Sequence, residues 1–419
     1  MKRSFASKIV FVMALVCQSL VGKAYSVLAH EALIDASWDK YFVPLIKEKF
    51  PGITDSLLKE THAYAYGGAV APDMGYYPFG SKLFTNLVHY VRSGDFVTAL
   101  LNEARNPDEY AFALGALCHY YADVYGHHLG VNASVPIEYP KDKEKFGNLV
   151  TYEEDPVSHK RIEFAFDVLE TAKGNYATKA YHDFIGFKVA DSVLDRAFYK
   201  TYKLHLTDIF SNFSRAVGTF RWTVKSFFPV LTKAAWASKH GDIKKHDSTM
   251  TAKKFRYRMN RMNYNKEFGR NRDKPRLFSF LFAGLIKIFP KIGPLKPLKF
   301  KAPSAEVEKL YVGSFDTVEA HYSKTLERLH SQNISLADKD FDTGKDSKPG
   351  EYKLTDQTYC DWLIALKKNN FQSVNNSVKQ NITDFLNNGV ALSEQKEDKK
   401  EDAAKALDEL KSLKSVGAQ

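Results

Sequence analysis

Three residues at regular spacing in the first half of the chain could carry chemistry: His119, Asp123 and His127 follow one another at four-residue intervals. Residues at i and i+4 share one face of an α-helix, so a single helix can present imidazole, carboxylate and imidazole in a row. Small and apolar residues over 110–118 indicate that this helix is buried. Because a buried charge is costly unless it is paired or bound to metal, the spacing predicts a zinc cluster. Hydrogen-bonded polar residues at a helix end are the alternative.

Three more candidate ligands lie earlier in the chain. His30 is near the start of a helix predicted over 25–50, and His89 lies in an amphipathic helix predicted over 84–101. Asp73 lies in a segment, 63–77, whose glycines and proline predict irregular structure. Taken singly, each has an ordinary explanation: a surface histidine at a helix entry, a turn-forming aspartate, a hydrogen-bonded histidine.

A second pair at helical spacing follows the central run. Pro156 opens a predicted helix that carries His159 and Glu163 one turn apart. Such a pair can hold another zinc ion or form a hydrogen bond. Between the two predicted helices, 132–152 is polar and turn-rich, so we expect a loop that reaches over the site.

The N-terminus is typical of a secretory signal. Lys2, Arg3 and Lys8 precede an apolar stretch that is too short for a comfortable membrane span, and small residues follow it. Cleavage after Ala24 would leave Tyr25 as the first residue, with the protein secreted or periplasmic. Cys17 could indicate a lipoprotein signal, but Val16 before it fits that signal poorly.

The chain has 60 Lys and Arg against 49 Asp and Glu, a formal net charge of +11. Removal of 1–24 takes away four basic residues and leaves about +7, which favours phosphate-rich partners such as lipid headgroups or nucleic acid. Cys118 and Cys360 remain and could pair, although a chain of this size does not depend on it. Cys118 is a poor metal ligand beside His119, since adjacent helical residues point about 100° apart.

Taken in order, these residues resemble the ligands of the zinc-dependent phospholipase C family, which includes the catalytic domain of glycosylphosphatidylinositol-specific phospholipase D. More distantly, they resemble the S1/P1 single-strand nucleases. The resemblance covers about 25–170 and depends on His-x3-Asp, His-x3-Glu and the Gly-Ala-x-x-Pro-Asp sequence that ends at Asp73. The chain offers Tyr25 where family members often begin with Trp, and its interval after Asp123 is short, which leaves His127 or His128 as the ligand. We favour His127.

The resemblance implies an all-α, phospholipase C/P1 nuclease-like helical bundle with three zinc ions and a phospholipid substrate. Asp73, His89, His119 and Asp123 would hold one ion. Asp123 would bridge to a second, held by His30 and the terminal amino and carbonyl groups of Tyr25. His127, His159 and Glu163 would hold the third. Asp73 and Glu163 would be catalytic, Asp73 by taking a proton from the attacking water and Glu163 by anchoring the zinc that activates the leaving group.

We divide the chain into a signal peptide (1–24), a catalytic domain (25–245), a basic apolar segment (246–305), a helical C-terminal region (306–392) and a charged, disordered tail (393–419). Residues 250–301 hold about fifteen Lys and Arg against two acids, interleaved with aromatic and apolar residues. This composition suits an anionic membrane surface or a nucleic-acid backbone, and a solvated loop or a cover on the helical core is the plain alternative.

The sequence therefore predicts a secreted or periplasmic zinc phosphodiesterase that hydrolyses phospholipid headgroups with a metal-activated water. An S1/P1-like nuclease is the nearest rival. The chain lacks the Gly-Asp-x-x-Gln-Pro-Leu-His sequence of such nucleases, so nucleic acid is the less favoured substrate. A non-catalytic zinc-binding surface protein is the third reading. We find no GxGxxG, P-loop or GxSxG motif and no internal repeat, and no protein partner is identifiable.

Overall fold

The structure is a computed structural model that describes residues 27–173, 187–224, 241, 244 and 301–413. The predicted all-α fold is confirmed: these residues form helices and no strand, and an isolated bridge between Lys339 and Asp346 is the only extended pairing among them. In the same ranges, each helix is too short or too polar to cross a bilayer. The predicted signal peptide lies outside these residues, as does the basic segment up to residue 300.

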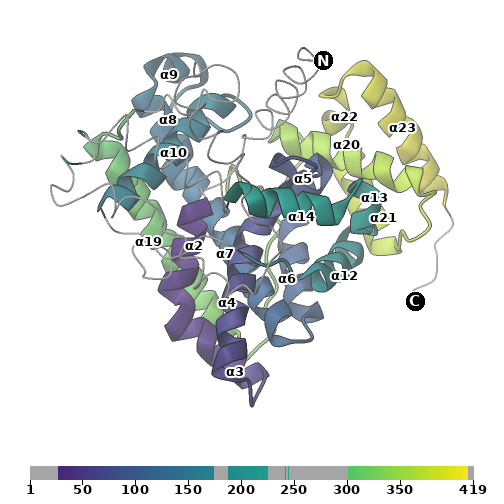
Figure 1. Cartoon of the computed structure of the whole chain (residues 1–419). Helices are drawn as coiled ribbons and strands as arrows, with labels where there is room; N and C mark the ends of the chain where they lie inside the picture. The colour runs from purple at the N-terminus through teal and green to yellow at the C-terminus, as the bar shows by residue number, and fades with distance from the viewer. Residues whose placement is uncertain (1–26, 174–186, 225–240, 242–243, 245–300, 414–419) are drawn as a thin grey trace, which may run out of the picture.

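A central pair of helices, α4 and α7, organises the fold (Figure 1). The helices of the first half are α2 (Val27–Ser37), the π-helix η1 (Trp38–Phe42), α3 (Val43–Lys49), α4 (Asp55–Val70), the 3-10 helix η2 (Ala71–Tyr76), α5 (Lys82–Tyr90), α6 (Ser93–Glu103), α7 (Pro107–Tyr125), the π-helix η3 (Gly126–Val131), α8 (Asn132–Glu138), α9 (Pro140–Phe146) and α10 (Pro156–Lys173). The later ones are α12 (Asp191–Tyr202), α13 (Leu206–Ile209), α14 (Phe213–Trp222), α19 (Ala305–Arg328), α20 (Lys353–Lys368), α21 (Asn376–Leu386), α22 (Val390–Ser393) and α23 (Glu397–Ser412). Figure 1 shows α8 to α10 on one side of this centre and α20 to α23 on the other.

Glycines allow α4 and α7 to pack backbone to backbone. A Cβ atom on Gly68 would lie 1.8 Å from the carbonyl oxygen of Phe112, and one on Gly115 would lie 2.0 Å from that of Ala65. The prediction of irregular structure over 63–77 was therefore wrong for 63–70, which are helical. Gly68 is required by the neighbouring helix and not by a turn, and the chain leaves the α-helical path only at η2, which carries Asp73.

Two other predicted segments differ from the structure. The helix expected over 84–101 is broken between α5 and α6, where Arg92 adopts a left-handed backbone conformation (φ +50°) and its side chain pairs with Asp95. The loop expected over 132–152 contains the short helices α8 and α9. Its two ends nevertheless reach the predicted site, because Asn132 and Tyr152 both contact it.

The predicted disordered tail is also a correction. Residues 397–412 form α23, which packs against α20. Ala403, Ala406, Leu407 and Leu410 recur at helical spacing and are buried, so the charged sequence carries a narrow apolar stripe that α20 covers.

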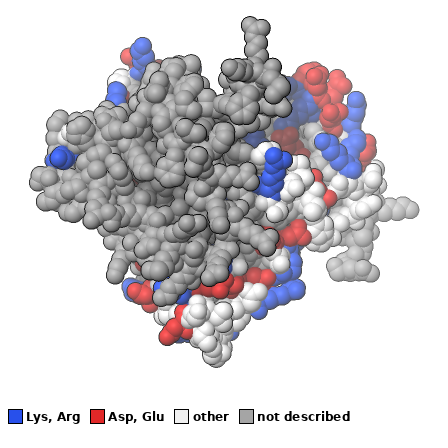
Figure 2. Space-filling model, viewed as in Figure 1, with Lys and Arg blue, Asp and Glu red and all other residues white. Residues whose placement is uncertain are grey.

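The C-terminal helices share a continuous hydrophobic core with the first half. On α19, the hydroxyl of Tyr322 donates to the carbonyl of Leu114 on α7 (2.9 Å). On α20, the indole of Trp362 donates to the carbonyl of Tyr202 (2.8 Å). Figure 2 shows acidic and basic side chains interspersed where the structure describes this face of the molecule. Helices that are distant in sequence can thus supply residues to one site.

Candidate metal centre

The structure brings together every predicted ligand within its described residues; Tyr25 falls outside them. The eight converging side chains are all buried: His30, Asp73, His89, His119, Asp123, His127, His159 and Glu163. They come from α2, η2, α5, α7, η3 and α10. His128, the alternative to His127, is half-buried and does not belong to any of the groups of side chains that could hold a metal ion.

The Nε2 atom of His89 has three possible metal donors around it at close to the spacing of a zinc site. The Nε2 atom of His89 lies 3.4 Å from Asp73 Oδ1, 3.2 Å from His119 Nε2 and 3.4 Å from Asp123 Oδ2. The distance from His119 Nε2 to Asp123 Oδ2 is 3.1 Å. Zinc bonds of about 2.0–2.2 Å in a tetrahedron separate neighbouring donors by about 3.3–3.6 Å. Asp73, His89 and His119 could therefore hold one metal ion, with Asp123 Oδ2 next to them.

The protonation of two of these histidines shows why a cation belongs between them. His89 Nδ1 lies 2.7 Å from the carbonyl oxygen of Thr85, and His119 Nδ1 lies 2.8 Å from that of Ala69. A carbonyl only accepts, so each Nδ1 carries a proton and each ring, when neutral, presents a lone pair at Nε2. Burial lowers the pKa of His89 to about 4, so at neutral pH its Nε2 can bind a metal ion.

The second oxygen of Asp123 faces a different group of side chains. Asp123 Oδ1 lies 3.5 Å from His30 Nε2 and 3.5 Å from His127 Nε2. The ring of His30 stacks on that of His119, with centroids 4.5 Å apart. Burial, followed by repulsion from His119, holds the pKa of His30 well below its usual value. Asp123 is thus placed to bridge two metal ions, one at each carboxylate oxygen.

A third group lies at the start of α10. His159 Nδ1 is 2.8 Å from Glu163 Oε1, and its ring stacks on that of His127 with centroids 5.0 Å apart. Burial lowers the pKa of His159, but the carboxylates of Glu163 and Asp342 outweigh it and raise this pKa to about 9. Burial likewise opposes protonation of His127, but Asp123 raises its pKa overall.

Residues 336–352 also contact the predicted ligands, and the sequence analysis did not predict this. The ring of Phe341 lies against those of His89 and His119, with centroids 5.2 and 5.9 Å away. Asp342 Oδ1 lies 3.6 Å from His127 Nδ1 and 3.5 Å from His159 Nε2. The alternating acids Asp338, Asp340 and Asp342 were the available signal, although the structure turns only the third toward the histidines.

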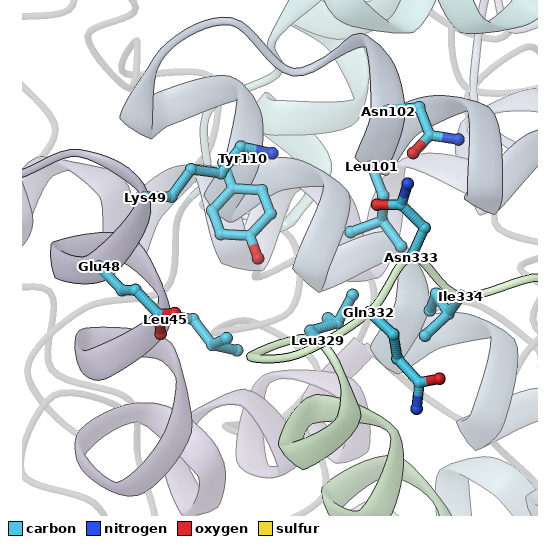
Figure 3. A pocket seen from close by; sticks show the side chains of 10 residues that line it. All are labelled: Leu45, Glu48, Lys49, Leu101, Asn102, Tyr110, Leu329, Gln332, Asn333 and Ile334. Carbon is cyan, nitrogen blue, oxygen red and sulfur yellow. The ribbon is translucent and has the colours of Figure 1, made fainter.

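The space at the metal centre is small. A cavity of about 10 Å³ lies among His89, Asp123 and Tyr152, with room for roughly one water molecule. A wider cleft of about 530 Å³ lies elsewhere, between α3, α6 and the end of α19 (Figure 3). Its lining includes Glu48, Lys49 and Tyr110 but no histidine, so it has no comparable donor set.

The fold and the donors define a class: an all-α protein whose buried histidines and carboxylates form several groups that could bind metal. More particularly, residues 30–212 match the model of the family described as zinc dependent phospholipase C. Neither the curated proteins nor the solved structures gave a match. The resemblances to glycosylphosphatidylinositol-specific phospholipase D and to S1/P1 nucleases remain predictions.

Proposed function

We propose that the protein is a secreted phosphodiesterase that binds three zinc ions and hydrolyses the headgroup phosphodiester of phospholipids. The observation that carries this proposal is the buried cluster in which donor atoms of Asp73, His119 and Asp123 lie 3.2–3.4 Å from Nε2 of His89. The cluster lies in the part of the chain that matches the zinc dependent phospholipase C family. The proposed location depends on the N-terminal sequence alone.

The residues of the chain are suited to the reaction. Zinc, when bound, lowers the pKa of a water ligand to about 7 and neutralises charge on phosphate oxygens. Asp73 is 2% exposed and lies beside His89, where its carboxylate can take a proton from water. The cavity beside His89 and Asp123 has room for roughly one water molecule, the size of the proposed nucleophile.

A buried ammonium group next to the site supports an anionic substrate. Lys160 follows His159 on α10, and its Nζ lies 4.9 Å from the ring centroid of Tyr152. Burial lowers the pKa of Lys160 to about 8, which still leaves most of the side chain protonated at pH 7. This charge complements a phosphate group.

The test is turnover of phosphatidylcholine vesicles by zinc-loaded protein, with the water-soluble product identified. Asp73→Asn should abolish turnover while circular dichroism and thermal unfolding stay as in the wild type. Asp39→Asn, a change at an exposed aspartate, is the matched control and should leave turnover unchanged. Retained turnover in zinc-loaded Asp73→Asn would contradict the role of Asp73. Activity on single-stranded DNA without activity on vesicles would replace the lipid substrate by nucleic acid.

A further inference from the structure

Asp342 lies beyond the part of the chain that matches the family, yet its carboxylate enters the metal centre. Its backbone carbonyl accepts from the side-chain amide of Asn132 (2.7 Å), and Asp342 Oδ2 accepts from the backbone N–H of Tyr152 (3.0 Å). The hydroxyl of Tyr352 also donates to Oδ2. These contacts fix the carboxylate and leave Oδ1, which is buried, directed at His127 and His159.

The segment that carries Asp342 is itself held against the helices that supply the predicted ligands. The backbone N–H of Phe341 donates to the carbonyl of His89 (3.1 Å), and the hydroxyl of Tyr120 donates to the carbonyl of Ala337 (2.9 Å). Gly94 allows the close approach, since a Cβ there would lie 2.3 Å from the carbonyl oxygen of Ala337. Asp342 is therefore positioned by backbone contacts on both sides.

The amide of Asn132 determines which nitrogen of His159 carries the proton. Its Nδ2 donates to the carbonyl of Asp342, so its Oδ1, 2.9 Å from His159 Nε2, must accept. His159 Nε2 therefore carries a proton, and Nδ1, beside Glu163, is the nitrogen that would release its proton when a metal binds. In His127, Nδ1 lies 3.6 Å from Asp342 Oδ1 and 3.3 Å from His159 Nε2, and Nε2 faces Asp123.

We propose that Asp342 is a positioning residue for the metal centre: its carboxylate lies beside Nδ1 of His127 and Nε2 of His159 and holds the two rings with their other nitrogens toward the metal ligands. Carboxylates behind metal-bound histidines fix the ring and its tautomer, and their loss typically weakens metal binding about 10- to 100-fold. This inference rests on the proposed zinc centre and adds a residue from outside the family domain to it.

The test is a stepwise zinc titration of the full chain against a competing chelator. In Asp342→Asn, the zinc held by His127 and His159 should bind about 10- to 100-fold more weakly, with the number of ions at saturation unchanged. The control is Asp346→Asn, on the same segment, where an exposed carboxylate pairs with Lys339. It should bind zinc like the wild type. Substitution of cobalt for zinc adds a spectroscopic readout, since the visible spectrum of this site should change in Asp342→Asn alone.

Tyr352→Phe provides a milder change if Asp342→Asn does not fold. It removes one hydrogen bond to Asp342 Oδ2 and keeps the carboxylate, so zinc should bind more weakly than in the wild type and more tightly than in Asp342→Asn. Unchanged zinc affinity in both variants overturns the proposal. Loss of a whole zinc equivalent from saturated Asp342→Asn also overturns it, because Asp342 would then be a ligand. A wild-type protein that binds no zinc would instead refute the proposed function.

Discussion

The two ends of the metal centre are built differently. At one end, His89 and His119 are oriented by backbone carbonyls, and the pKa of His89 is lowered to about 4. At the other end, His159 is surrounded by the carboxylates of Glu163 and Asp342, and its pKa is raised to about 9. Metal binding requires neutral histidine. The first end is thus ready for zinc at neutral pH, whereas the second must release a proton first.

The largest expected effect comes from the residue that both ends share. Asp123→Asn removes the charge that faces His89 and His119 through one oxygen and His30 and His127 through the other. We expect the loss of more than one zinc equivalent on dialysis. Turnover should fall by at least about 100-fold, which is the upper end of the effect expected for residues that only hydrogen-bond to metal ligands. Asp108→Asn, on the same helix but remote from the donors, should retain both. An Asp123→Asn protein that loses a single zinc would show that the ends are independent.

A smaller effect should come from the helix pair that supports the first end alone. In Gly68→Ala the new methyl group would meet the carbonyl of Phe112, so α4 and α7 must separate. Overpacking of this kind costs about 1–3 kcal/mol of unfolding free energy. Because Ala69 orients His119, zinc affinity at the first end should fall as well.

Gly218→Ala is the matched control for this change, since it introduces the same methyl group on α14 with no atom within 4 Å. It should stabilise the protein by about 0.4–1 kcal/mol. Urea unfolding and zinc titration check both variants. If Gly68→Ala were as stable as Gly218→Ala, the close helix contact would not be what orients His119.

The most gradual effect is a pH dependence of opposite sign at the two ends, measured by urea unfolding of chelator-treated protein. His159 has a folded pKa near 9, above the unfolded value of about 6.5. Protonated His159 therefore stabilises the folded protein fully below pH 6.5, and this contribution is lost as the pH rises toward 9. For His89, with a folded pKa near 4, stability is instead lost as the pH falls from 6.5 toward 4. Each slope is at most about 1.4 kcal/mol per pH unit.

Two variants separate these slopes. His159→Gln should remove the loss of stability on the alkaline side, and His89→Gln the loss on the acidic side. If the free energy of unfolding changes with pH equally in wild type and His159→Gln between pH 6.5 and 9, His159 is not held in its charged form.

The sequence predicted most of the centre because its ligand pairs are local. His119 with Asp123 and His159 with Glu163 need only a helix to share a face, and both helices form. Gly68 was misread because the contact that requires it lies on α7, which no local pattern reveals. Asp342 was missed for the same reason at greater range: its position depends on hydrogen bonds to Asn132 and Tyr152, far earlier in the chain. The helix α23 was missed because its four buried residues are a minority in a charged stretch.

The late arrival of Phe341 and Asp342 has a consequence for biosynthesis. A ribosome must translate beyond codon 342 before the wall over His89 can form, although every histidine of the centre has emerged long before. An unfinished nascent chain therefore carries an open cluster. In this protein, closure of the site by Phe341 therefore requires translation to continue well past the residues that match the family.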